Sequence, residues 1–96
     1  MPIVFCGLDI HLSGCRSLKE KRNILRKTAG RLRARFNFSI SEIDHHDLWQ
    51  RSRLGAVSIG PDRRKLEQIS GKLIEESERI LGGDLIGHEI EFFEYD

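Results

Sequence analysis

Residues 17–35 read SLKEKRNILRKTAGRLRAR, and this stretch predicts one long amphipathic helix. Ser17 and Glu20 form an S-x-x-E capping box, which marks the start of the helix. Apolar residues recur at helical spacing, namely Leu18, Leu25, Ala29, Leu32 and Phe36, with Ile24 and Thr28 beside them. The pattern predicts a helix over residues 18–35. Gly30 lies inside it at a cost of about 1 kcal/mol relative to alanine, which indicates close packing against a sheet.

Alternating apolar residues predict four strands around this helix. The strands span residues 3–12, 38–44, 54–59 and 85–95. A second helix is predicted over residues 63–81, with Asp62 as its N-cap and Gly82 directly after its end. Residues 45–51 form a polar connection that carries the only tryptophan of the chain.

The order of these elements is β-α-β-β-α-β. Each β-α-β half needs a right-handed crossover, which places both helices on the same face of an antiparallel sheet. The sequence therefore predicts an α+β, ferredoxin-like sandwich. A chain of 96 residues has room for one domain, so we expect a single ferredoxin-like domain over residues 1–96.

The composition is typical of a cytoplasmic protein. Hydrophobic residues make up 39% of the chain, which is enough to form a core. No apolar run approaches the roughly 18 residues needed to cross a bilayer, and the N-terminus lacks the basic segment of a signal peptide. Cys6 and Cys15 are predicted to lie too far apart for a disulfide and to remain free thiols. We therefore expect a cytoplasmic protein with no membrane partner.

Charged residues are segregated along the chain, although the net charge is only +1. Residues 16–35 contain nine basic residues and one acidic residue, whereas residues 75–96 contain eight acidic residues and one basic residue. The local field, rather than the total charge, decides what a surface attracts. The first helix is therefore a candidate anion-binding element.

Four short segments of the sequence match a known family. They are SLKEKR at 17–22, FNFSISEID at 36–44, DLWQR at 47–51 and GAV at 55–57. In these segments the chain resembles the YlxP-like family of small bacterial proteins of unknown function. The resemblance implies a ferredoxin-like fold, a bacterial cytosolic setting and an accessory role in small-subunit maturation or translation, because family genes tend to neighbour those of translation initiation factor two and ribosome-binding factor A. It supplies no catalytic residues, and His45 and His46 stand where relatives carry an aromatic residue and an amide.

The basic first helix is the main candidate for a binding function, because lysine and arginine contacts to phosphates give salt-dependent, sequence-tolerant binding. The candidate nucleic-acid-binding residues are Arg16, Lys19, Arg22, Arg26, Arg33 and Arg51. We expect ribosomal RNA or the small ribosomal subunit as their partner. The alternative is a solvated helix face, since Glu75, Glu76 and Glu78 of the second helix could pair with part of this charge.

One face of the predicted sheet is left uncovered by the helices. The third strand lacks the aromatic residues with which an RNA-recognition motif stacks bases, and the fourth strand carries three glutamates that would repel phosphate. This open face predicts a homodimer that forms through Phe5, Phe93 and Tyr95 or through the edge strands. A homodimeric interaction module that binds no nucleic acid is therefore the alternative function, and a small-molecule-binding domain is a third.

The connection at residues 45–51 contains Trp49 and Gln50, which could anchor a partner. We favour the interpretation that Trp49 covers the end of the core, with Gln50 and Arg51 pinning the loop. The sequence DHHD at 44–47 is expected to be a surface turn, because neighbouring side chains of a strand point to opposite faces and rarely share a metal ion. No catalytic motif, cofactor fingerprint or metal-ligand set is present, so we expect no enzyme, cofactor or metal.

Overall fold

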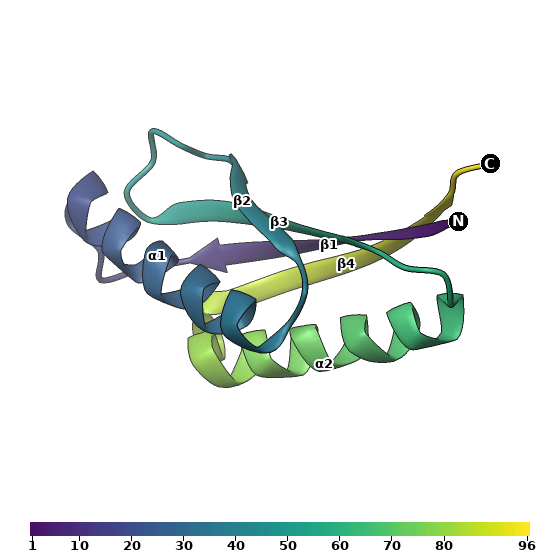
Figure 1. Cartoon of the computed structure of the whole chain (residues 1–96). Helices are drawn as coiled ribbons and strands as arrows, with labels where there is room; N and C mark the ends of the chain where they lie inside the picture. Colours follow the sequence, from purple (N-terminus) through teal and green to yellow (C-terminus); the bar gives the residue numbers. More distant parts are fainter.

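Both helices lie on one side of a four-stranded antiparallel sheet in the computed structural model, which describes residues 1–96 (Figure 1). The strands are β1 (Pro2–His11), β2 (Ser39–Asp44), β3 (Arg51–Ile59) and β4 (Leu85–Glu94). The helices are α1 (Leu18–Arg35) and α2 (Arg63–Leu81), and a short 3-10 helix, η1 (Gly82–Asp84), precedes β4. The predicted α+β, ferredoxin-like fold is confirmed.

The strands are ordered β2-β3-β1-β4, so β1 and β3 lie inside the sheet and β2 and β4 form its edges. Pairing between β1 and β3 runs from Ile3 opposite Ile59 to His11 opposite Arg51. β3 therefore begins at Arg51, earlier than the predicted residue 54. The first residues of β3 are polar, so the alternation of apolar residues does not extend to them. Only the pairing with β1 identifies them as part of the strand.

Side-chain caps fix where both helices begin. Ser17 Oγ accepts a hydrogen bond from the backbone N–H of Glu20 at 3.1 Å, as the capping box predicts. The Glu20 carboxylate accepts the backbone N–H of Arg16 at 3.2 Å rather than that of Ser17. Asp62 Oδ1 accepts two N–H groups of the first turn of α2, at 2.9 and 3.3 Å. Because these bonds are local, both helices have the predicted bounds.

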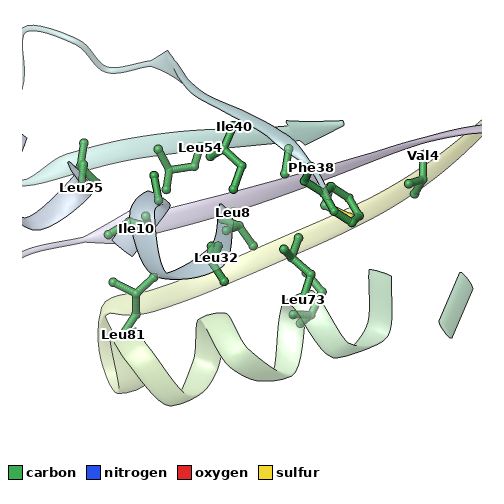
Figure 2. Packing of buried hydrophobic residues seen from close by; sticks show 14 of the residues in the cluster. Val4, Leu8, Ile10, Leu25, Leu32, Phe38, Ile40, Leu54, Leu73 and Leu81 are labelled. Atoms are coloured by element: carbon green, nitrogen blue, oxygen red, sulfur yellow. The ribbon is translucent and has the colours of Figure 1, made fainter. Parts of the chain in front are cut away.

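The hydrophobic core lies between the helices and the sheet. Figure 2 shows side chains of both layers directed toward one another. The apolar residues with no accessible surface are Val4, Cys6, Leu8, Ile10, Leu32, Ala56 and Leu73. Every second residue of β1 from Val4 to Ile10 thus faces the helices, which leaves the intervening residues on the open face.

The outer face of α1 includes Gly30, which is exposed. A Cβ atom added at this position would meet no neighbouring atom within 4 Å. The prediction of close packing at Gly30 is therefore wrong, and the buried face of the helix is formed by Leu25, Ala29 and Leu32 among others. Neither α1 nor α2 has the length and the apolar composition that a membrane crossing requires.

Both cysteines are buried free thiols, as predicted. Cys6 faces the core from β1, and Cys15 lies before the start of α1, where its Sγ is 3.4 Å from the backbone oxygen of Ser17. Burial raises the pKa of the Cys6 thiol above its ordinary value, with a hydrogen bond to Ser70 acting in the opposite direction. Cys6 is therefore a structural residue with little thiolate character in the folded protein.

We expect the free energy of unfolding to decrease as the pH rises above the ordinary thiol pKa of 9.0. The unfolded chain ionises at that value while folded Cys6 stays neutral, so its contribution is complete below this pH and is lost as the pH rises through the folded-state pKa. Urea unfolding between about pH 8 and about pH 10 measures this loss. Cys6→Ala should be less stable throughout but less sensitive to pH. An equal decrease for both proteins would contradict the prediction.

Candidate nucleic-acid interface

Most of the positive charge near α1 has no acidic partner. Of the nine basic residues at 16–35, only Lys21 and Arg35 have a carboxylate within ion-pair distance. Arg35 pairs with Glu76 of α2, which is the single cross-helix pair of the kind that the sequence allowed. The basic residues without such a partner are Arg16, Lys19, Arg22, Arg26, Lys27, Arg31 and Arg33.

Three of the predicted residues, Arg22, Arg26 and Arg33, line one groove between α1 and the edge strand β2. The groove has a volume of about 270 Å³. Its other lining residues are Leu25, Ala29, Ile40, Ser41, Glu42 and Leu54. At a rise of about 1.5 Å per residue, the Cα atoms of Arg22 and Arg33 are separated by about 16 Å along the helix. The groove therefore has room for several phosphates of an extended strand.

The arginines of this groove differ in how firmly they are held. Arg33 donates a hydrogen bond from Nη2 to the backbone oxygen of Ile40 at 2.6 Å, which fixes its guanidinium at the edge of β2. Arg26 donates from Nη1 to Asn23 Oδ1 at 3.3 Å, and Arg22 is exposed without a protein partner. Arg22 and Arg26 are thus the freer cations of the groove.

Lys21 belongs to the basic stretch but is not available to a ligand, because none of its surface is accessible. Its Nζ donates hydrogen bonds to the backbone oxygens of His45, Arg51 and His46, at 2.8, 3.2 and 3.3 Å. The same amine lies 3.0 Å from a carboxylate oxygen of Glu42. Lys21 therefore fastens the loop between β2 and β3 to the start of α1.

The position of Lys21 in the sequence does indicate that this lysine is buried, although the pattern of charge does not. Lys21 lies three residues after Leu18 and four before Leu25, which places it on the apolar stripe of the helix. A lysine at a core position needs an acidic or polar partner from another element. The partner cannot be identified without the fold, since Glu42 is on β2.

The loop between β2 and β3 exposes Trp49 and Leu48, whose exposed fractions are 52% and 49%. The interpretation that Trp49 covers the end of the core is therefore wrong. The expected pinning by Gln50 is confirmed, because its Nε2 donates to the backbone oxygens of Ser13 and Cys15, each at 3.2 Å. The expected pinning by the Arg51 side chain is wrong, since its Nε has no hydrogen-bond partner and only its backbone oxygen takes part, as an acceptor from Lys21.

The remaining predicted residues lie outside the groove. Arg16 and Lys19 are exposed at the start of α1, and Arg16 directly follows Cys15, whose backbone oxygen binds Gln50. Arg51 is partly buried, and its Nε has no hydrogen-bond partner. Three of the six candidates therefore line the groove, Arg16 and Arg51 are next to the loop, and Lys19 is exposed on the first turn of α1.

The predicted surface turn at residues 44–47 is confirmed. His45 has a positive φ of 63°, and its backbone N–H donates to Asp44 Oδ1 at 2.7 Å. A ring nitrogen of His46, Nε2, lies 3.0 Å from the backbone oxygen of Glu42. No three histidine, cysteine, aspartate or glutamate side chains of the protein are grouped as a metal site would require.

The open face of the sheet carries the residues predicted for a dimer. Phe93 is 50% exposed and stands opposite Ile3, whose other neighbour in the register is Ile59. Phe5 lies within the same face, and Tyr95 follows the end of β4 with an exposed fraction of 67%. Ile59 of β3 lies next to these residues in the register, whereas the prediction from the sequence included only residues of β1 and β4 and the edge strands.

An ion cluster divides this open face. Arg53 pairs with Asp9 at 2.8 Å and with Glu89, and its guanidinium lies 5.9 Å from the centre of the Phe5 ring. The guanidinium also covers Gly7, where an added Cβ atom would collide with Nη2. The hydrogen bond with Asp9 raises the pKa of Arg53 further above its usual value. One guanidinium thus faces the two carboxylates of Asp9 and Glu89, so the charge of Glu89, which was predicted to repel phosphate, is only partly compensated.

Comparison with known sequences identifies a family. The model of the family DUF503, described as a protein of unknown function, matches residues 3–89. Uncharacterized protein YlxP from Bacillus subtilis (strain 168) is 42% identical over 63 residues, which are 66% of this chain and 66% of that protein. The match therefore spans just under two thirds of the length of this curated relative.

Solved structures with the same fold have unrelated sequences. SnoaB, a cofactor-independent oxygenase from Streptomyces nogalater, has a TM-score of 0.55 at 14% identity, over 99% of this chain and 93% of the other. A C-terminal segment of the alpha subunit of aIF2 from Pyrococcus abyssi has a TM-score of 0.53 at 15% identity, over 100% of this chain and 52% of the other. At these identities the similarity demonstrates the fold alone.

Proposed function

We propose that this chain, which belongs to the DUF503 family of proteins of unknown function, is a non-enzymatic RNA-binding factor that associates with the small ribosomal subunit. The observation that carries the proposal is the groove between α1 and β2, which Arg22, Arg26 and Arg33 line without any carboxylate partner. The ribosomal target comes from the resemblance of the sequence to the YlxP-like family.

The groove suits a phosphate backbone better than a reacting substrate. Its single carboxylate, Glu42, is 3.0 Å from Lys21 Nζ and accepts a hydrogen bond from Ser52 Oγ at 2.7 Å. Both contacts are made to Oε2 and the lysine compensates the charge of the carboxylate, so the uncompensated charges of the groove are those of its arginines. Arginine binds phosphate through a planar set of N–H groups and remains charged at any physiological pH.

Binding in this groove should depend steeply on salt, because each phosphate that an arginine neutralises releases a counterion. Three contacts to a single strand predict a slope of about −2 for the logarithm of the association constant against the logarithm of the salt concentration. The bases are not read in this mode, so little dependence on RNA sequence is expected.

The variant Arg22→Glu/Arg26→Glu is expected to weaken RNA binding at least about tenfold at low salt, because two phosphate contacts become repulsive. Arg33 is left intact, since it also binds the backbone of β2. Fluorescence anisotropy with a labelled single-stranded RNA and co-sedimentation with small ribosomal subunits measure the effect. Unfolding stability should change by no more than about 0.5 kcal/mol per exposed site.

The matched control is Arg64→Glu/Lys72→Glu, which makes the same change of charge at exposed positions of α2. This variant should retain most of the affinity of the wild type. Equal weakening by both variants would indicate a general effect of net charge and would contradict the assignment of the groove. A wild type that ignores RNA and ribosomal subunits even at low salt would refute the proposed function.

The second candidate function is a homodimeric interaction module, and the exposed apolar residues of the open face favour it. Val57, Ile59 and Phe93 are 42%, 55% and 50% exposed on this one face. A second copy of the chain could cover them. Size-exclusion chromatography with light scattering, run beside the RNA titration, separates the two functions. A dimer that binds no RNA would favour the interaction module.

A further inference from the structure

The backbone on both sides of Trp49 is held by hydrogen bonds. The buried amine of Lys21 donates to the backbone oxygens of His45 and His46 in the loop and of Arg51, the first residue of β3. Gln50 binds the backbone of Ser13 and Cys15, and the backbone N–H of Leu12 donates to the Gln50 oxygen at 2.8 Å. These bonds restrain the backbone that carries Trp49, whose side chain is 52% exposed. Pre-organised aromatic side chains lose little conformational entropy when they bind a partner.

This loop stands at one end of the arginine groove. Lys21 and Arg22 are neighbours on α1, and Lys21 binds the loop while Arg22 lines the groove. Glu42 belongs to the lining of the groove and pairs with the same lysine. Figure 1 shows the loop between β2 and β3 beside the first turns of α1. A strand that follows the groove from Arg33 toward Arg22 would therefore arrive at the loop.

The surroundings of Trp49 combine an aromatic surface with positively charged side chains. Residues 47–51 line an open hollow of about 400 Å³. Asp47 contributes a negative charge to this lining and Arg51 a positive charge. Arg51 Nε is buried without a hydrogen-bond partner, and Arg16 adds a second cation close to the loop. An aromatic ring beside cations is the usual means by which proteins bind unpaired nucleotides.

We infer that an unpaired base stacks on Trp49 while the phosphates of the same RNA strand lie along Arg22, Arg26 and Arg33. The inference rests on the proposed function and narrows its ligand to single-stranded RNA. Bases of a duplex are stacked on one another, so they cannot offer a free face to the indole. Trp49 then contributes by contact with the base, and the groove contributes by contact with the backbone. An acidic protein partner is the competing occupant that the experiment must exclude.

The intrinsic fluorescence of Trp49 tests this inference directly, because it is the only tryptophan of the chain. Titration with a single-stranded oligoadenylate of about ten nucleotides, a length within the site size of common single-strand binders, is expected to quench the emission in proportion to binding. Inorganic polyphosphate should compete for the groove but leave the emission nearly unchanged, since it carries no bases. Duplex RNA of the same length should bind more weakly and quench less.

Variants of the loop separate stacking from folding. Trp49→Ala should lower the affinity for the oligoadenylate about tenfold, whereas Trp49→Phe should keep most of it. Ile86→Ala, at a similarly exposed apolar position of β4 outside the hollow and the groove, should have little effect, and all three proteins should unfold at similar urea concentrations. Because Phe retains an aromatic face, rescue by Trp49→Phe is the result that a merely structural role would not produce.

Several results would overturn the inference. If Trp49→Ala bound RNA as tightly as the wild type while Arg22→Glu/Arg26→Glu did not, the proposed function would stand and the stacking role would fall. Stronger binding of duplex than of single-stranded RNA would have the same meaning. Polyglutamate that quenched the emission as strongly as RNA does would indicate an acidic protein partner instead. An absence of any RNA binding by the wild type would remove both proposals.

Discussion

Replacement of Lys21 by methionine is expected to destabilise the domain by about 3–5 kcal/mol. Methionine has a side chain of similar length, but it removes a donor from three backbone oxygens and leaves the Glu42 carboxylate without its cation. Domains of this size have a total stability of about 5–15 kcal/mol, so the loss would consume a large part of it. The loop around Trp49 should also lose its fixed position.

Urea unfolding of Lys21→Met beside Lys19→Met measures this effect with the same substitution on the same helix turn. Lys19 is exposed and has no ion pair, so its replacement should change the free energy of unfolding by no more than about 0.5 kcal/mol. The double variant Lys21→Met/Glu42→Met should lose less than the sum of the single variants, because no buried charge is left alone. Equal stabilities of the two lysine variants would refute the structural role of Lys21.

Replacement of Leu32 by alanine is expected to cost about 2–5 kcal/mol. Leu32 has no accessible surface and lies in the core between α1 and the other elements, where Figure 2 shows it among the buried side chains. The loss contains the transfer free energy of the removed atoms and the cost of the cavity that remains. Urea unfolding measures the loss as a lower transition midpoint with an unchanged dependence on denaturant.

Leu48→Ala provides the matched control for this core substitution, because Leu48 is 49% exposed on the loop between β2 and β3. The same chemical change there should alter stability by no more than about 0.5 kcal/mol. A loss of similar size at both positions would mean that Leu32 does not occupy the core that the structure assigns to it.

The helices could be predicted to the residue because the signals for their ends are local. Ser17 and Asp62 cap the N–H groups of the residues that immediately follow them, and the apolar stripes have a helical period. The start of β3 could not be predicted in this way. Arg51 and Ser52 join the strand only because β1 presents a partner edge from a distant part of the chain.

The candidate site was predictable as a set of charges but not as a surface. The segregation of charge identified Arg22, Arg26 and Arg33, and all three line the groove. The groove forms only because α1 packs beside the edge strand β2. This tertiary contact could not be predicted from the sequence residue by residue. The burial of Lys21 and the exposure of Trp49 also depend on tertiary packing. Hydrophobicity alone would bury the tryptophan and expose the lysine.

The order of the strands places the basic groove and the glutamates of β4 at opposite edges of the sheet. The basic groove lies at the β2 edge, whereas Glu89, Glu91 and Glu94 belong to β4 at the other edge. The protein is therefore an electric dipole, even though its net charge is only +1. Such a molecule experiences a torque near a polyanion and rotates its basic edge forward before contact. The acidic edge, in turn, disfavours encounters in the reverse orientation.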